Sequence, residues 1–410
     1  MEQELENEKL KNLLSQIRLI IEQGERLAKL QGENFNIFSI LSMESAENKT
    51  HSAFLSELLN PLGTHGMGVA FLRVFVSMLQ LGTPIRKQLY DFTCEGASVT
   101  TEYHTGAMNL ESSTGGRIDL YIKDSKGLSI IIENKIFAGD QPKQIERYCN
   151  FNPQNNTVFY LTLNGTEPDK TSRGNLVAGE DFYLLSYRNH IIDWLTECQR
   201  ISTDQPILRE TIKQYIILLK KLTNQLTINA MKEDVSNIIL RNLKESKCIY
   251  DNYQATVAAV RNAFRNAVCE EIRLLEPNCK CILGGDISGG NAHIIIDTDT
   301  NDVKIIVESF SGQSWFSNDG LCVGLFMSEK RVSKERFDHI KTIFDKKNLQ
   351  HEGWWFGRKK LGAAGELILS DLEVVTALVD GQYRQGKAKL IAAQIMDFKK
   401  EHAKLLDTLE

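Results

Sequence analysis

Apolar positions recur with the period of an α-helix in the first part of the chain. Residues 1–32 are polar overall but carry leucine or isoleucine at helical spacing, which predicts a long amphipathic helix. Two further helices are predicted, one from about Asn48 to Pro61 and one from about Val69 to Leu81. The glycine-rich stretch between these two helices predicts a turn.

The pattern changes near residue 96 to short apolar or alternating runs, which are typical of β-strands. A helix is predicted over residues 141–150, and helical periodicity resumes from Ile191. Together these elements predict a compact βββαβ core, wrapped by helices, over about residues 35–225. The strands are expected at residues 97–104, 117–123, 128–134, 157–163 and 182–186.

The remainder of the chain predicts a separate α+β domain. A long helix, from Val235 to Leu275, precedes a second set of strands and two more helices. The strands are expected at residues 293–297, 303–309 and 321–327, and the helices at residues 334–346 and from Val374 onwards. We therefore expect an N-terminal helix (residues 1–34), a core domain (35–225) and a C-terminal domain (226–410). The last would serve targeting or assembly, through a homodimer or a partner protein.

Composition places the chain among ordinary globular proteins. It has 410 residues, of which 42% are hydrophobic and 25% are charged. No apolar run reaches the roughly 18–20 residues that span a bilayer. The charged start of the chain, residues 1–11, lacks the apolar stretch of a secretory signal. A cytoplasmic protein without a membrane segment is expected.

The eight cysteines are scattered along the chain, and only Cys279 and Cys281 lie close together. This pair has no second pair to complete a zinc site. Free, reduced thiols are the expectation for a cytoplasmic protein. All eight are Cys94, Cys149, Cys198, Cys248, Cys269, Cys279, Cys281 and Cys322.

Charge limits how the chain can contact nucleic acid. The formal net charge of −5 argues against a surface that is basic throughout. It does not exclude a site built from carboxylates, because bound metal ions neutralise the negative charge of such a site. One local candidate is Trp354–Lys360, which joins aromatic to cationic residues. The alternative is that these aromatic residues belong to a core strand.

The residues that indicate chemistry lie between residues 115 and 148. Glu133 and Lys135 are two apart on an apolar strand, so both point to the same face of the sheet. A three-residue hairpin loop would pair Asp124 with Leu128 and set Asp119 opposite Glu133. A two-residue loop would shift this register.

Two carboxylates so close together repel each other unless a cation lies between them. The natural occupant is Mg²⁺ or Mn²⁺, held by Asp119, Glu133 and the backbone carbonyl of Asn134. In a hydrolysis reaction at this metal, Lys135 would orient the attacking water or stabilise the negative charge of the transition state. The alternative is a salt-bridged triad on a solvated hairpin. The consecutive isoleucines Ile130–Ile132 argue against it, because they indicate burial on both faces.

This arrangement resembles the PD-(D/E)XK nuclease superfamily, whose pattern is an Asp and then Asp/Glu-x-Lys across a hairpin. Here Asp119 is followed, after thirteen residues, by Glu133-Asn134-Lys135, and Ile118 stands where the family motif often has proline. An uncharacterised, mostly bacterial branch is similar over about residues 44–195. The further matching positions are Glu47, His51, Ser52, Phe54, Leu55, Pro61, Gly63, His65 and Gly66.

The resemblance implies the restriction-endonuclease-like fold, a mixed sheet flanked by helices, and roles for further residues. It implies that Glu47, rather than Glu44, completes the acidic cluster near the metal. Gln144 and Tyr148, one helical turn apart, would face the site. The basic residues of the same helix would either meet phosphates or form a solvated edge, and they are Lys143 and Arg147.

Other polar residues carry weaker expectations. Glu102 is a spare carboxylate that would approach the site from the first strand. His51 is expected to be a packed helix residue rather than a base. The resemblance does not cover residues 226–410.

The expected function is a Mg²⁺-dependent phosphodiesterase that cleaves DNA, in host defence or DNA processing. An enzyme acting on RNA would use the same chemistry. The alternative from another class is a non-cleaving module that binds nucleic acid or protein. Metal binding between Asp119 and Glu133 discriminates between the two classes.

Overall fold

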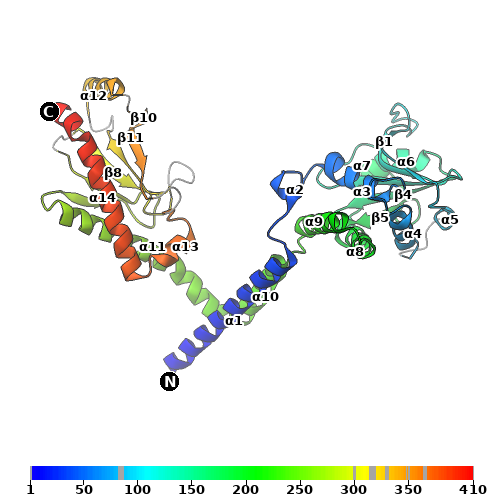
Figure 1. Cartoon of the computed structure of the whole chain (residues 1–410), viewed down its shortest axis with the longest axis horizontal. Helices are drawn as coiled ribbons and strands as arrows, with labels where there is room; N and C mark the ends of the chain where they lie inside the picture. Colours follow the sequence, from blue (N-terminus) through cyan, green and yellow to red (C-terminus); the bar gives the residue numbers. More distant parts are fainter. Residues whose placement is uncertain are drawn as a thin grey trace. The chain divides into compact units, whose positions relative to one another are not determined.

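The computed structural model of the chain divides into two compact units, residues 1–241 and 242–410 (Figure 1). The first unit extends beyond the predicted boundary at 225/226. The reason is that helix α10 (Thr227–Arg241) packs along helix α1 (Glu2–Gln31). The residues described are 2–81, 87–298, 302–313, 320–327, 332–347, 349, 351–362 and 367–409.

The two helices α1 and α10 approach closely at Gly24. A Cβ atom added there would lie 2.9 Å from Sδ of Met231, so a larger residue would require the Met231 side chain to move. Helical periodicity predicted α1 correctly.

A five-stranded sheet forms the centre of the first unit, in the order β1-β2-β3-β4-β5. The first three strands are antiparallel neighbours, whereas β3, β4 and β5 run parallel. This is the mixed sheet that the sequence predicts. The strands are β1 (Ser98–His104), β2 (Arg117–Lys123), β3 (Ser129–Lys135), β4 (Asn156–Thr162) and β5 (Tyr183–Ser186).

Helices cover both faces of this sheet, which explains the run of isoleucines in β3 (Figure 1). Ile130 and Ile132 pack with the helices α3, α4, α8 and α9, while Ile131 packs with α6 on the other face. The helices are α3 (Ala53–Leu59), α4 (Ala70–Leu81), α6 (Gln144–Asn150), α8 (Ile192–Ile201) and α9 (Pro206–Leu222). Shorter elements are α2 (Ile37–Ile40), η1 (Glu47–Ser52), α5 (Lys87–Tyr90), α7 (Lys170–Arg173) and η2 (Tyr187–Ile191).

The hairpin between β2 and β3 has the predicted three-residue loop. The backbone N–H of Asp124 donates to the carbonyl of Leu128 over 3.0 Å, and Gly127 adopts a positive φ of 91°. The Asp124 carboxylate accepts the N–H groups of Lys126 and Leu128, each over 2.8 Å. The strand register confirms the prediction from the loop length.

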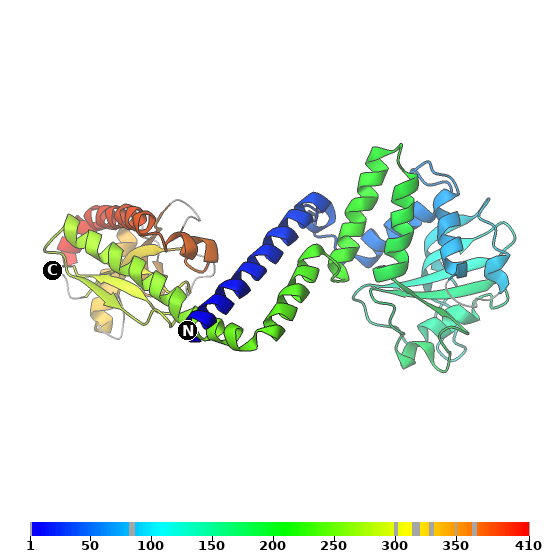
Figure 2. The ribbon, with the colours of Figure 1, turned by 90° about the horizontal axis from the view of Figure 1, so that it is seen from below.

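The second unit contains an antiparallel six-stranded sheet in the order β10-β11-β9-β8-β7-β6. Helices α11 (Leu243–Leu275) and α14 (Gly381–Leu406) lie side by side on it, and α14 is drawn in red in Figure 2. The strands are β6 (Cys281–Gly284), β7 (His293–Ile296), β8 (Lys304–Glu308), β9 (Cys322–Phe326), β10 (His351–Glu352) and β11 (Trp355–Lys360). The other helices are α12 (Lys334–Lys346), α13 (Leu372–Ala377) and the short η3 (Asp407–Leu409).

The long helix predicted from Val235 to Leu275 is wrong in one respect. The structure has two helices there, α10 and α11, which are separated at Asn242. Asn242 has φ −133° and ψ 45°, outside the helical region.

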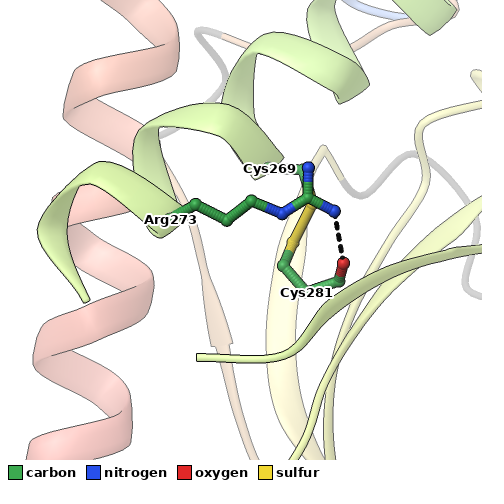
Figure 3. Close-up of a disulfide and its surroundings, with 3 residues drawn as sticks. All are labelled: Cys269, Arg273 and Cys281. Atoms are coloured by element: carbon green, nitrogen blue, oxygen red, sulfur yellow. Dashed lines mark hydrogen bonds between the residues drawn. A yellow bond between two sulfur atoms is a disulfide. The ribbon is translucent and has the colours of Figure 1, made fainter. Parts of the chain in front are cut away.

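A disulfide bond joins Cys269 of α11 to Cys281 of β6 (Figure 3). The expectation of free thiols is therefore wrong for these two residues. The chain turns back between α11 and β6, and this brings together cysteines that are 12 positions apart. The guanidinium of Arg273 donates to the carbonyl of Cys281 over 2.8 Å beside the disulfide (Figure 3). The other six cysteines are present as thiols.

Across the described segments of the chain, the search for a helix with the length and apolar character of a membrane span found none.

Candidate active site

Asp119, Glu133 and Lys135 converge where β3 ends. The Lys135 ammonium donates to Oε1 of Glu133 over 2.8 Å. Oδ2 of Asp119 accepts the backbone N–H of Asn134 over 2.8 Å. The register that pairs Leu120 with Ile132 sets Asp119 opposite Glu133.

Glu133 and Lys135 are buried and Asp119 is partly buried, which argues against the alternative of a solvated salt-bridged triad. Glu133 is 1% exposed and Lys135 is 9% exposed. A buried charge is costly unless it is paired, hydrogen-bonded or bound to a metal. The ion pair between Glu133 and Lys135 meets this requirement for those two charges. Asp119 adds a second carboxylate charge beside them.

Burial and mutual repulsion shift the pKa values of both acids. Burial raises the pKa of Asp119 to about 6, although the Asn134 N–H and the Lys135 charge oppose the rise. Burial and then the charge of Asp119 hold the pKa of Glu133 well above its usual value. For Lys135, burial would lower the pKa, but the charge and hydrogen bond of Glu133 outweigh it and the pKa is raised.

One carboxylate oxygen of this cluster has no partner. Oε2 of Glu133 is buried and makes no hydrogen bond, whereas Oε1 receives both Lys135 and Gln144. An unpaired buried carboxylate oxygen next to a second carboxylate has the chemistry of a ligand for a hard divalent cation. The residues present therefore fit Mg²⁺ or Mn²⁺.

Side chains alone do not complete such a site. Within the segments that the structure describes, no three His, Cys, Asp or Glu residues are grouped closely enough to hold a metal ion. Mg²⁺ commonly uses one or two carboxylates and fills its other positions with waters and phosphate oxygens. Two carboxylates are thus enough for a site that also binds a phosphate.

Glu47 approaches the cluster from η1, and it makes backbone contacts that the sequence did not predict. Its Oε1 accepts the backbone N–H groups of Ile136, Phe137 and Ala138 over 2.6, 2.7 and 2.9 Å. Its charge also contributes to the raised pKa of Lys135. Glu47 therefore fixes the segment that follows Lys135. Glu44 instead pairs with Lys221.

Asn134 is clamped by residues that the sequence did not single out for this role. Its side-chain amide donates to Oγ of Ser52 over 3.0 Å, and its side-chain oxygen accepts the hydroxyl of Tyr187 over 2.8 Å. Asn134 is 1% exposed. Its backbone is thus fixed between Glu133 and Lys135.

His51, which precedes Ser52 in the chain, makes a second set of buried contacts. The Nδ1 atom of His51 lies 2.9 Å from the hydroxyl of Tyr215, and its Nε2 atom lies 3.0 Å from the carbonyl of Glu44. His51 is fully buried and burial lowers its pKa. It is a packed, hydrogen-bonded residue, as expected.

Helix α6 brings Gln144 and Tyr148 to the site. The Gln144 amide donates to Oε1 of Glu133 over 2.6 Å. The Tyr148 hydroxyl donates to the carbonyl of Arg117 over 2.5 Å, and burial raises its pKa. Both residues therefore hold the strands and the Glu133 carboxylate in place.

The two basic residues of α6 have different environments. Lys143 is half-buried and adopts a left-handed backbone with φ 55°. Arg147 is 1% exposed, and its guanidinium donates to the carbonyl of Gly115 over 2.7 Å. This burial contradicts the alternative of a solvated edge for Arg147, whose guanidinium holds the loop before β2, and its contact with a phosphate stays a prediction.

Glu102 lies beside the cluster, on β1. The pairs that flank it in the register, Thr101 with Leu120 and Tyr103 with Ile118, set it opposite Asp119. Its charge contributes to the raised pKa of Asp119, and its carboxylate pairs with Arg117.

Two surface hollows contain residues that adjoin the site. One has a volume of about 390 Å³ and is lined by Ser45, Ala46, Glu47, Asn48, Lys49, Phe137 and Ala138. The other has a volume of about 540 Å³ and is lined by His104, Gly106, Ala107, Met108, Gly116, Arg117, Gln141 and Arg147. Sequence reasoning had not marked Phe137, because a single apolar residue carries no pattern.

A mixed five-stranded sheet with paired acids and a lysine at the end of its central strand defines a nuclease-like fold. Residues 35–217 match the family model described as PD-(D/E)XK nuclease superfamily. A search of curated proteins found no match, and neither did a search of solved structures. Members of the superfamily are generally phosphodiesterases that use divalent metals, which indicates nuclease activity on nucleic acid.

Proposed function

We propose that the chain is a Mg²⁺- or Mn²⁺-dependent nuclease that hydrolyses phosphodiester bonds of DNA. The observation that supports this most directly is the buried, unpartnered Oε2 of Glu133 beside Asp119, with the Lys135 ammonium on the other oxygen. A purely structural ion pair would not need the second buried acid.

Asp119, Glu133 and the backbone carbonyl of Asn134 would hold the metal. When bound, the metal lowers the pKa of a water and neutralises charge on the phosphate. Asn134 contributes through its clamp, because Ser52 and Tyr187 fix its side chain and thereby its backbone.

Lys135 would position the attacking water and stabilise the negative charge that develops on the phosphate. Its ammonium stays protonated at neutral pH because the Glu133 charge raises its pKa. Gln144 orients Glu133, and Glu47 fixes the backbone after Lys135. Lys143, which is partly exposed and immediately precedes α6, would contact a phosphate of the substrate.

The second unit would serve targeting or assembly, through a homodimer or a partner protein, in a cytoplasmic defence or DNA-processing system. Trp354 and the basic residues of β11 (Trp355–Lys360) would offer an aromatic ring and positive charge to nucleic acid, whereas Phe356 belongs to the core of the second unit.

The test is cleavage of plasmid DNA, single-stranded DNA and RNA in Mg²⁺ or Mn²⁺. We expect metal-dependent cleavage of DNA that falls by at least about 100-fold in Lys135→Ala. Lys126→Ala is the matched control, since Lys126 is an exposed lysine at the other end of the same hairpin. Full activity of Lys135→Ala would reject the assignment. Binding without cleavage in every metal would favour the non-cleaving module, and cleavage of RNA alone would replace DNA as the substrate.

A further inference from the structure

We propose that Phe137 and Lys49 form a subsite for an unpaired nucleotide next to the scissile phosphate. This inference rests on the proposed nuclease function and extends it, because it specifies which form of nucleic acid enters the site. The proposal depends on three observations: the exposure of Phe137, the hollow that its ring borders, and the presence of Lys49 in the same hollow.

Phe137 is exposed at a position where its backbone is held in place. Its side chain is 65% exposed, two residues after Lys135. Its own N–H and those of its two neighbours all donate to Oε1 of Glu47. The aromatic ring is therefore presented to solvent by an ordered backbone beside the candidate catalytic lysine.

The ring borders a hollow that is large enough for a small ligand. The hollow has a volume of about 390 Å³, which lies within the range of roughly 300–1,000 Å³ for ligand pockets. Phe137 and Ala138 line one part of it, and Ser45–Lys49 line the rest. One side thus offers an aromatic face and the other an exposed ammonium, that of Lys49.

An aromatic face and an ammonium in one hollow match the two parts of a nucleotide. Any nucleobase can stack on a phenylalanine ring, and an ammonium can neutralise the adjoining phosphate. A base within a duplex has both faces covered by its neighbours, so only an unpaired or extruded base can stack on Phe137. The subsite therefore favours single-stranded nucleic acid, or a duplex with an unpaired nucleotide at the cleavage position.

A single exposed apolar side chain is common on protein surfaces and needs no function. Two contacts of Glu47 distinguish Phe137 from such a residue. The carboxylate of Glu47 fixes the backbone that presents the ring, and the same carboxylate lines the hollow.

The experiment measures binding without cleavage, in the full chain with the Lys135→Ala substitution and EDTA. The probe is a single-stranded oligonucleotide that contains 2-aminopurine, whose fluorescence falls when it stacks on a ring. We expect Phe137→Ala to raise the Kd about tenfold and to abolish the quenching. Phe137→Trp should restore both. Lys49→Ala should weaken binding and reduce its dependence on salt.

Tyr90→Ala is the matched control, because Tyr90 is an exposed aromatic residue, 54% exposed, on a different element of the same unit. It should change neither the Kd nor the quenching. Unchanged Kd and quenching in Phe137→Ala, with a melting temperature equal to that of the parent, would overturn the subsite.

Failure of the subsite and failure of the proposed function give different results. If the chain with Lys135 intact cleaves DNA and Phe137→Ala cleaves single and double strands in the same ratio as the parent, the subsite is rejected and the nuclease stands. If the chain cleaves nothing but its quenching depends on Phe137, the nuclease is rejected and the subsite stands.

Discussion

Asp119 and Glu133 destabilise the fold when no cation is bound. Burial raises the pKa of Asp119 to about 6 from 3.8, and that of Glu133 also rises. The folded chain therefore holds these protons more tightly than the unfolded chain. For Asp119, the free energy of unfolding therefore decreases as the pH rises from about 4 through about 6, and the raised pKa of Glu133 extends the decrease to higher pH.

Asp119→Asn should therefore stabilise the metal-free protein at pH 8. We expect the free energy of unfolding to rise by about 1–2 kcal/mol, because the amide removes a buried charge and its oxygen can still accept the Asn134 N–H. Urea denaturation at pH 8 and pH 4 measures this difference, which should shrink at pH 4. Glu111→Gln, at an exposed carboxylate, serves as the control. A less stable Asp119→Asn at pH 8 would contradict the argument.

A divalent cation should reverse the effect of the two acids. We expect Mn²⁺ to raise the melting temperature of the parent protein at pH 8, since a ligand that binds only the folded state stabilises it. Asp119→Asn should show little or no shift. An equal shift in both proteins, measured by calorimetry, would place the cation elsewhere.

The sequence pattern singled out the candidate site residues that share one strand pair, and the resemblance added Glu47, Gln144 and Tyr148, but two buried tyrosines were missed. Asp119, Glu133 and Lys135 stand out because period-2 spacing puts them on one face of apolar strands. Tyr187 and Tyr215 meet Asn134 and His51 only through the fold, so no spacing rule predicts them.

The β2–β3 hairpin determines the geometry of the acids at the level of secondary structure. Its loop length sets the register, and the register sets Asp119 opposite Glu133. Gly127 makes this loop possible with its φ of 91°, which a side chain rarely tolerates.

Gly127→Ala should destabilise the first unit by about 1 kcal/mol, because alanine is strained at positive φ. Space is not the cause, since a Cβ at Gly127 meets nothing within 4 Å. Gly139→Ala is the matched control, as it also meets nothing within 4 Å and lacks a positive φ. Equal stabilities of the two variants in urea denaturation would show that the loop carries no such strain.

Most strands and helices follow from the apolar pattern, and the exceptions have physical reasons. The break at Asn242 was not visible because helical periodicity continues on both sides of it. Strand β6 was missed because it is only four residues long and its two middle residues, Ile282 and Leu283, are exposed, so it shows no alternating pattern of burial. The disulfide was missed because its cysteines belong to a helix and a strand that only the fold brings together.

At the scale of the whole molecule, the family match lies entirely within the first unit. The second unit has its own sheet, its own apolar core and a disulfide within its bounds. Each unit thus has the elements of an independently folding domain.

A fragment of residues 1–241 should fold without the rest of the chain. We expect a single cooperative melting transition and metal-dependent cleavage of DNA that equals that of the full chain on nonspecific substrate. Circular dichroism and the cleavage assay measure these two properties. An unfolded fragment would show that the second unit is needed for stability, and a folded but inactive one would show that it contributes to the site.

The hairpin that carries the acids has a consequence for synthesis on the ribosome. Asp119, Glu133 and Lys135 come from one short stretch, so their contacts have low sequence separation and can form early. The tyrosine that clamps Asn134 and the one that binds His51 are translated much later, in η2 and α9. A nascent chain that ends before α9 therefore carries all three reactive groups without their full support. Under the proposed function, competence to cut nucleic acid would begin only when α9, the last helix around the sheet, has emerged.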